Sequence, residues 1–129
     1  MGCFYTGYAY KQRKYGYFKI GETSHQTPAK RLSQIRQEWG GFECLGYLIL
    51  TEETHAERLF IESYVRMKMS QMQNFQHKGN DYFLYSMQSG KAKSPQAHSI
   101  ADLALNFAIE ACQMQGIIYT IGTKKYSRG

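Results

Sequence analysis

Hydrophobic and polar positions near the start of the chain follow the pattern of two β-strands. Residues 4–11 and 17–22 are rich in tyrosine, phenylalanine and isoleucine, which favour strands. The residues between them, 12–16, are polar and end in Gly16, as a hairpin loop does. We therefore expect the two strands to pair antiparallel.

The next segment carries the signals of a helix start and a helix stop. Thr27 fits an N-cap, Pro28 fits the first helical position, and Leu32 and Ile35 form an inward apolar stripe. Two glycines at 40–41 then interrupt the pattern. These signals predict a helix of about three turns.

The middle of the chain predicts a third strand followed by a long helix. Residues 42–50 are dense in leucine, isoleucine and aromatic side chains, which indicates a mostly buried strand. Thr51 and Thr54 both fit the N-cap of an amphipathic helix that runs through Arg66 or beyond. Near its end, three methionines are expected to pack in the core: Met67, Met69 and Met72.

The rest of the chain predicts a polar break, a short strand and a long loop, at residues 74–80, 81–85 and 86–99. Ser99 fits the N-cap of a last helix over residues 100–115, which Gly116 ends. Residues 117–121 are a candidate edge strand, and residues 124–129 form a basic tail. Together the elements predict an α/β fold with a small, mainly antiparallel three-stranded sheet, of order 2-1-3 or similar, covered by helices.

Length and charge bear on domain number and partner. A chain of 129 residues is the usual size of one domain. Its net charge of +6 is uneven: residues 1–40 carry seven basic and two acidic side chains (+5), residues 41–85 four and six (−2), and residues 86–129 five and two (+3). A basic chain with 11 Tyr, 7 Phe and 1 Trp suits a polyanionic partner, because cations bind phosphate and aromatic rings stack on bases.

Cysteine usage and hydropathy predict the compartment. Cys3, Cys44 and Cys112 are odd in number and lack C-x-x-C spacing, so the sequence indicates neither a disulfide framework nor a zinc site. No apolar run approaches the roughly 20 residues of a membrane span. The N-terminus also lacks the apolar core of a signal peptide. We therefore expect a soluble, cytoplasmic protein with reduced thiols and no membrane partner.

Two short motifs and an arginine suggest a family. Residues 7–10 read Gly-Tyr-Ala-Tyr, residues 19–23 read Lys-Ile-Gly-Glu-Thr, and Arg31 follows eight residues later. Residues 4–60 resemble the GIY-YIG nuclease superfamily, in particular its viral and prophage branch, where the second signature commonly reads Lys-Ile-Gly. The resemblance implies a divalent-metal-dependent endonuclease that hydrolyses phosphodiester bonds in DNA, in a bacterial host or a phage-infected cell. No residue distinguishes DNA from RNA as the substrate.

Tyrosines are the candidates for positioning the attacking water. Strand alternation puts Tyr8 and Tyr10 on one face of the first strand, and Tyr17 and Lys19 on one face of the second. We expect these side chains to converge on a single surface that binds a phosphate. The resemblance assigns the water to the first signature tyrosine, which is Tyr10 or Tyr8, and the alternative role of either is packing within the sheet.

Arg31 and Glu57 complete the predicted catalytic set. The resemblance implies that Arg31, with Lys19, binds the scissile phosphate through its fork of donors. It implies that Glu57 holds one Mg²⁺ or Mn²⁺, whose coordination shell water and phosphate complete. Residues 54–57 also fit a capping box, in which the only role of Glu57 would be to stabilise the start of a helix. Glu62 is the alternative ligand of the metal ion. The four histidines lack paired metal spacing and are expected at the surface: His25, His55, His77 and His98.

Residues 86–129 carry no recognisable motif and are predicted to be a C-terminal extension of the single domain, for dimerisation or substrate selection. A homodimer is therefore one expected assembly. A second hypothesis for the whole chain is a non-catalytic module that binds nucleic acid or protein with the same fold and basic face.

Overall fold

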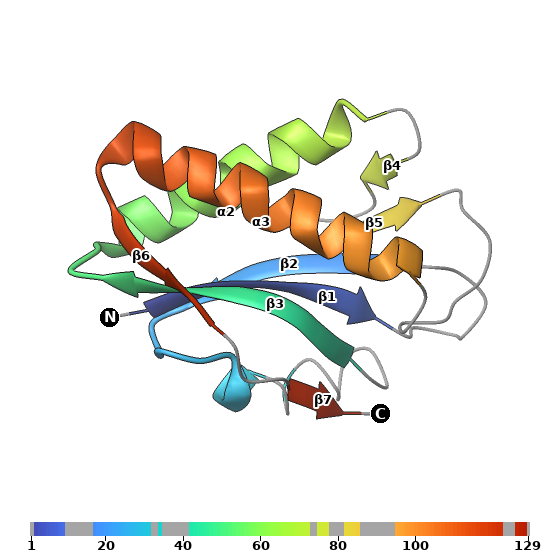
Figure 1. Cartoon of the computed structure of the whole chain (residues 1–129), viewed down its shortest axis with the longest axis horizontal. Helices are drawn as coiled ribbons and strands as arrows, with labels where there is room; N and C mark the ends of the chain where they lie inside the picture. Colours follow the sequence, from blue (N-terminus) through green and yellow to red (C-terminus); the bar gives the residue numbers. More distant parts are fainter. Residues whose placement is uncertain are drawn as a thin grey trace.

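The computed structural model describes residues 2–9, 17–31, 34, 42–72, 75–77, 82–85, 95–122 and 126–128. Only the backbone is described at positions 8, 9, 17, 75–77, 82–85, 95–98 and 126–128. Two helices, α2 and α3, cover one face of an antiparallel sheet (Figure 1). The predicted α/β class, with an antiparallel sheet packed against helices, is confirmed.

The centre of the sheet consists of the three predicted strands. They are β1 (Gly2–Ala9), β2 (Tyr17–Thr23) and β3 (Phe42–Thr51), and β1 pairs antiparallel with both neighbours. The predicted order 2-1-3 is therefore confirmed. Because β1 is central, side chains on both of its faces are buried from Gly2 to Gly7.

The sheet is larger than the three strands predicted, because the described residues form seven. On one side β5 (Tyr82–Tyr85) pairs with β2, and β4 (Phe75–His77) pairs with β5. On the other side β6 (Ile118–Ile121) and β7 (Tyr126–Arg128) both pair with β3. Strands β4 and β7 were not predicted, and they fall in the predicted polar break and basic tail. Formation of a short edge strand depends more on the neighbouring strand with which it pairs than on its own apolar pattern.

Helix α2 (His55–Ser70) begins at the predicted cap, whereas α3 (Pro95–Gln115) begins five residues before the predicted start. Proline suits the first helical position, since its missing N–H has no partner there in any helix. Residues 95–99 are therefore helical and not part of a loop. Helix α3 ends as predicted at Gly116, whose φ of 68° favours glycine, and the Ile117 N–H closes the end by donating to the Cys112 carbonyl at 2.9 Å.

The segment after β2 lies on the side of the sheet opposite α2 and α3 (Figure 1). Residues 29–31 and 34 are helical, and the Arg31 N–H donates to the Pro28 carbonyl at 2.9 Å. The first helical turn therefore begins at Pro28, as predicted. The rest of its expected three turns, including Leu32 and Ile35, lies outside the described residues.

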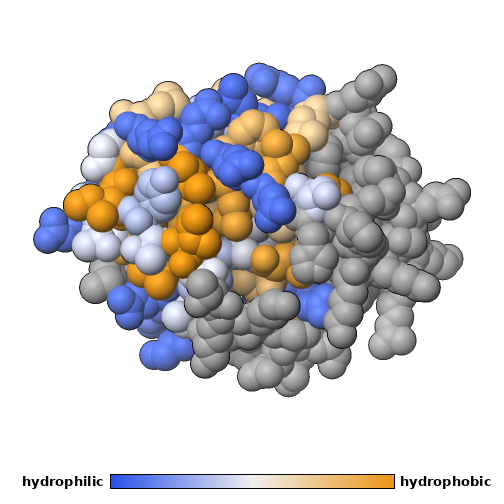
Figure 2. All heavy atoms as spheres, in the orientation of Figure 1, coloured by the Kyte–Doolittle hydropathy of each residue, from blue (hydrophilic) through white to orange (hydrophobic). Residues whose placement is uncertain are grey.

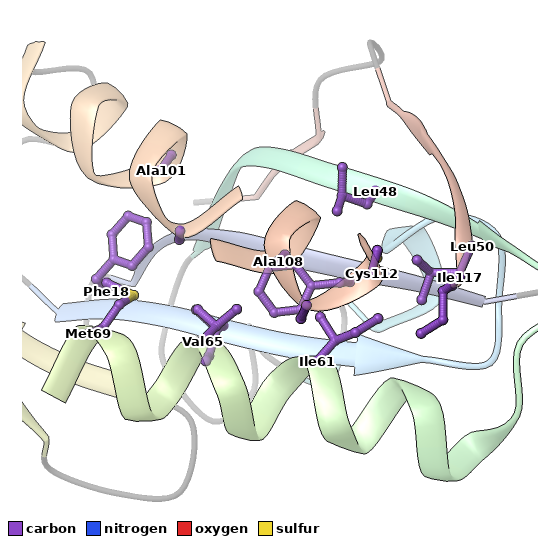
Figure 3. Close-up of a cluster of buried hydrophobic side chains, with 14 of the residues drawn as sticks. Phe18, Leu48, Leu50, Ile61, Val65, Met69, Ala101, Ala108, Cys112 and Ile117 are labelled. Atoms are coloured by element: carbon purple, nitrogen blue, oxygen red, sulfur yellow. The ribbon is translucent and has the colours of Figure 1, made fainter. Parts of the chain in front are cut away.

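The core lies between the helices and the sheet (Figure 3). Helix α2 contributes Ile61, Val65 and Met69, four residues apart, while Met67 is exposed, so its predicted place in the core is wrong. Helix α3 presents mainly small side chains to the sheet: Ala101, Ala104, Ala108, Ala111 and Cys112. Small residues let the backbone of α3 approach the strands closely. Helix α3, which lies within the predicted extension 86–129, therefore belongs to the same core as the rest of the domain.

The outer edge of the sheet at β6 exposes apolar side chains. Ile118 and Ile121 are 62% and 55% exposed, and hydrophobic residues gather over this strand on the face seen in Figure 2. Strand β6 itself was predicted as an edge strand, and it is one. Among the described helices, none has the length and apolar composition to span a bilayer.

Candidate functional site

An open polar pocket of about 310 Å³ lies where β2 ends and α2 begins. Three segments line it: the end of β2 with the bend that follows, the first turn of the helix after β2, and the first turn of α2. The lining residues are Glu22, Thr23, Ser24, Arg31, His55 and Arg58. The pocket therefore brings two arginines and a histidine from distant parts of the sequence to one place.

Arg58 makes most of the side-chain hydrogen bonds described around the pocket. Its Nε donates to the Glu22 carboxylate at 2.8 Å, and its Nη1 donates to the Glu53 carboxylate at 2.8 Å. The side chains of Arg58 and Glu22 are 11% and 15% exposed, and that of Glu53 is fully buried. Burial would lower the pKa of the Arg58 guanidinium, but the hydrogen bonds and charges of the two glutamates more than offset it and raise that pKa.

Register explains why Glu22 can meet Arg58. Glu22 pairs with Phe4 across β1 and β2, so both side chains lie on the face that α2 and α3 cover. The two ion pairs thus join β2 and the turn before α2 to the first turn of α2. The sequence interpretation missed Arg58, and its position four residues after the Thr54 cap was the available signal.

Arg31 reaches the pocket from the opposite side of the sheet. It lies in the first helical turn after β2 and is partly exposed, and its Nη1 donates to the Gln34 side chain. His55 is exposed, as predicted for the histidines, but it also lines the pocket. Its Nδ1 lies 3.3 Å from Arg58 Nη2.

Glu57 forms the capping box at the start of α2. Its Oε1 accepts the Thr54 N–H at 2.9 Å, and its own N–H donates to Thr54 Oγ1 at 3.1 Å. Glu57 is half-buried and, within the described part of the chain, does not line the pocket, although His55 and Arg58 on the same helix turn do. The second carboxylate oxygen leaves Glu57 able to act as the single protein ligand of a hydrated hard cation.

The expected convergence of Tyr8 and Lys19 on one surface is wrong. In the β1–β2 register Tyr8 pairs with Phe18, and Lys19 pairs with Gly7. Paired residues share a face and neighbours in a strand alternate, so positions 8 and 19 lie on opposite faces. Lys19 is only 3% exposed and is not among the residues that line the pocket. Tyr10 and the side chains of Tyr8 and Tyr17 lie outside the described residues.

One described phenol that shares the face of Lys19 is Tyr5, which the sequence interpretation did not consider. Tyr5 pairs with Gly21, and a Cβ placed at Gly21 would lie 2.4 Å from the Tyr5 hydroxyl oxygen and 2.5 Å from its ring. The glycine of Lys-Ile-Gly therefore makes room for a fully buried tyrosine. Tyr5 and Lys19 lie 14 positions apart, and in this register only an even separation keeps two residues of these strands on one face, so the register was needed to identify Tyr5.

No group of three or more histidine, cysteine, aspartate or glutamate side chains gathers as a metal cage within the described ranges. A site built on Glu57 would therefore rely on water and substrate for most of its ligands, as magnesium sites commonly do. Comparisons of the chain with protein-family models, with curated proteins and with solved structures find no match.

Proposed function

We propose that the protein is a metal-dependent endonuclease of the GIY-YIG type that hydrolyses phosphodiester bonds in DNA. The observation that carries the proposal is the pocket that Arg31, His55 and Arg58 line together. Guanidinium groups present several N–H donors in a plane, and this arrangement matches the oxygens of a phosphate. The Lys-Ile-Gly signature in β2, and Arg31 in the helical turn after it, support the same assignment.

Each proposed site residue then has a distinct role. Arg31 binds the scissile phosphate and stabilises the charge that develops on it during cleavage. Glu57 would hold Mg²⁺ or Mn²⁺, and the cation, when bound, supplies further positive charge to the phosphate. Tyr8 or Tyr10 positions the attacking water. Lys19, on the face opposite position 8, is not assigned to the same phosphate.

A second candidate function is a phosphate-binding module without turnover, which binds DNA or another polyanion. The capping box favours it, because one Glu57 oxygen already serves the helix and Glu57 lies outside the pocket lining. The two functions predict different behaviour for the same protein. The nuclease cleaves DNA when Mg²⁺ or Mn²⁺ is added, whereas the module binds DNA without cleaving it.

Arg31 variants test the proposal. We expect Arg31→Ala to lower single-turnover cleavage by about 10²–10⁴-fold while DNA affinity falls much less, because the lost donors act mainly on the transition state. Arg31→Lys should restore little, since a point charge does not reproduce the fork. The assay uses supercoiled, linear, single-stranded and branched DNA, and a matched RNA, with Mg²⁺ or Mn²⁺.

Lys30→Ala is the matched control, because Lys30 is an exposed cation next to Arg31 that does not line the pocket. It should cleave at the native rate. A native protein that binds DNA but cleaves none of these substrates with either metal ion would contradict the nuclease and support the binding module. Preferential cleavage of the RNA would show that the substrate is RNA and not DNA.

A further inference from the structure

We infer that His55 is a second phosphate-binding residue of this pocket, held by Arg58 in the tautomer that donates a hydrogen bond from Nε2. The inference rests on the proposed function in one respect, since it takes a DNA phosphate as the ligand. It adds a residue that neither the signature motifs nor the predicted catalytic set contains.

The contact between Arg58 and His55 fixes the tautomer. Arginine carries five N–H donors and no acceptor, so in the 3.3 Å contact of Arg58 Nη2 with His55 Nδ1 the histidine nitrogen accepts. A ring whose Nδ1 accepts is neutral and carries its proton on Nε2. His55 lines the pocket, and with Nδ1 engaged by Arg58 the ring nitrogen it can offer to a ligand there is the Nε2–H donor.

The position of Arg58 makes this arrangement rigid. Two of its nitrogens are occupied by Glu22 and Glu53 at 2.8 Å each, and the guanidinium is largely buried. A planar guanidinium held at two corners has little freedom to turn, so its third nitrogen stays directed at His55. The histidine ring is therefore oriented before any ligand arrives, and little conformational entropy is lost on binding.

Charge in the pocket explains the value of a neutral donor. Glu22 and Glu53 carry two negative charges against the one positive charge of Arg58, so these three groups together give no net attraction for an anion. Arg31 supplies the other positive charge in the lining. A neutral Nε2–H adds a hydrogen bond to a phosphate oxygen beside the charge of Arg31.

Three substitutions at His55 separate donation from the contact with Arg58. His55→Ala removes both nitrogens, His55→Gln keeps an N–H near the position of Nε2, and His55→Asn keeps a polar group near Nδ1 only. Binding of a fluorescent DNA duplex is measured by anisotropy at pH 8, low salt and with EDTA, so that no cleavage occurs. We expect His55→Ala and His55→Asn to weaken binding roughly tenfold and His55→Gln to stay near the native affinity.

Gln113→Ala is the control, since Gln113 is exposed on α3 and outside the pocket. Two-bond ¹H–¹⁵N correlation of the native protein at the same pH should show the His55 proton on Nε2. A proton on Nδ1, or native affinity of His55→Ala, would overturn the inference. If the native protein cleaves DNA and His55→Ala binds DNA with native affinity, this inference is refuted and the nuclease proposal stands. If His55→Ala loses tenfold in DNA affinity but the native protein never cleaves DNA, only the nuclease proposal is refuted.

Discussion

At the residue scale, Glu57 shows how one side chain can fit two roles. Its first oxygen closes the capping box with Thr54, a role that needs only an acceptor. A cation, in contrast, needs the negative charge of the carboxylate. Glutamine keeps the acceptor and the size but loses the charge, so a single substitution separates the two roles.

We expect Glu57→Gln to abolish metal-dependent cleavage while the melting temperature and the DNA affinity stay close to native values. The matched control is Glu62→Gln on the same helix, which should cleave normally. Cleavage, thermal melting and anisotropy on the same preparations check this. Native cleavage by Glu57→Gln would restrict Glu57 to capping, and loss of cleavage in Glu62→Gln would move the metal ligand to Glu62.

At the scale of secondary-structure elements, the Arg58 ion pairs join elements that the sequence separates. Glu22 lies 36 residues before Arg58, and Glu53 lies in the turn that precedes α2. Further along α2, the Tyr64 hydroxyl donates to Glu110 of α3 and joins the two helices, and Lys68 of α2 lies over the Tyr64 ring. Contacts with β2 and with α3 thus hold α2 at two places along its length, and the ion pairs of Arg58 hold its first turn at the pocket that Arg31 also lines.

We expect Arg58→Met to lower the free energy of unfolding by about 3–5 kcal/mol, because it leaves the fully buried Glu53 carboxylate without its cation. Urea denaturation at pH 7 measures the change. Arg66→Met, on the same helix but outside these ion pairs, should change stability by less than about 1 kcal/mol. Equal stability of Arg58→Met and the native protein would show that the ion pairs contribute nothing net.

At the scale of the whole molecule, the three thiols report how completely the fold excludes water. Cys3 in β1, Cys44 in β3 and Cys112 in α3 are all buried and free. Burial is the main cause that raises the pKa of Cys3 and of Cys44 to about 12, and that of Cys112 to about 11. Each thiol is therefore neutral in the folded protein at a pH where an exposed thiol ionises.

This difference predicts a loss of stability at alkaline pH. The pKa values of the three thiols in the folded protein lie above the ordinary value of 9.0. Their contribution to the free energy of unfolding is therefore fully present below pH 9. Above pH 9 the unfolded chain releases the protons first, so the free energy of unfolding should fall between about pH 9 and 12. Urea denaturation at pH 8, 9 and 10 measures the fall. Cys44→Ala should make it shallower, and an unchanged slope would contradict the role of this thiol.

Local patterns in the sequence determined much of this protein. The alternating and apolar runs predicted β1, β2 and β3, the Thr54 to Glu57 spacing predicted the start of α2, and Gly116 predicted the end of α3. Each of these features depends on residues within a few positions of one another. Short-range preferences and hydrogen bonds are therefore enough to specify them.

Tertiary structure alone decided which side chains meet. The register of β1 and β2 puts Tyr5, and not Tyr8, on the face of Lys19, because moving the pairing by one residue would exchange the two faces. The contact of Glu22 with Arg58, and the shared pocket of Arg31 and His55, require the packing of α2 against the sheet. No local pattern encodes these distances, since they follow from how the whole chain buries its apolar surface.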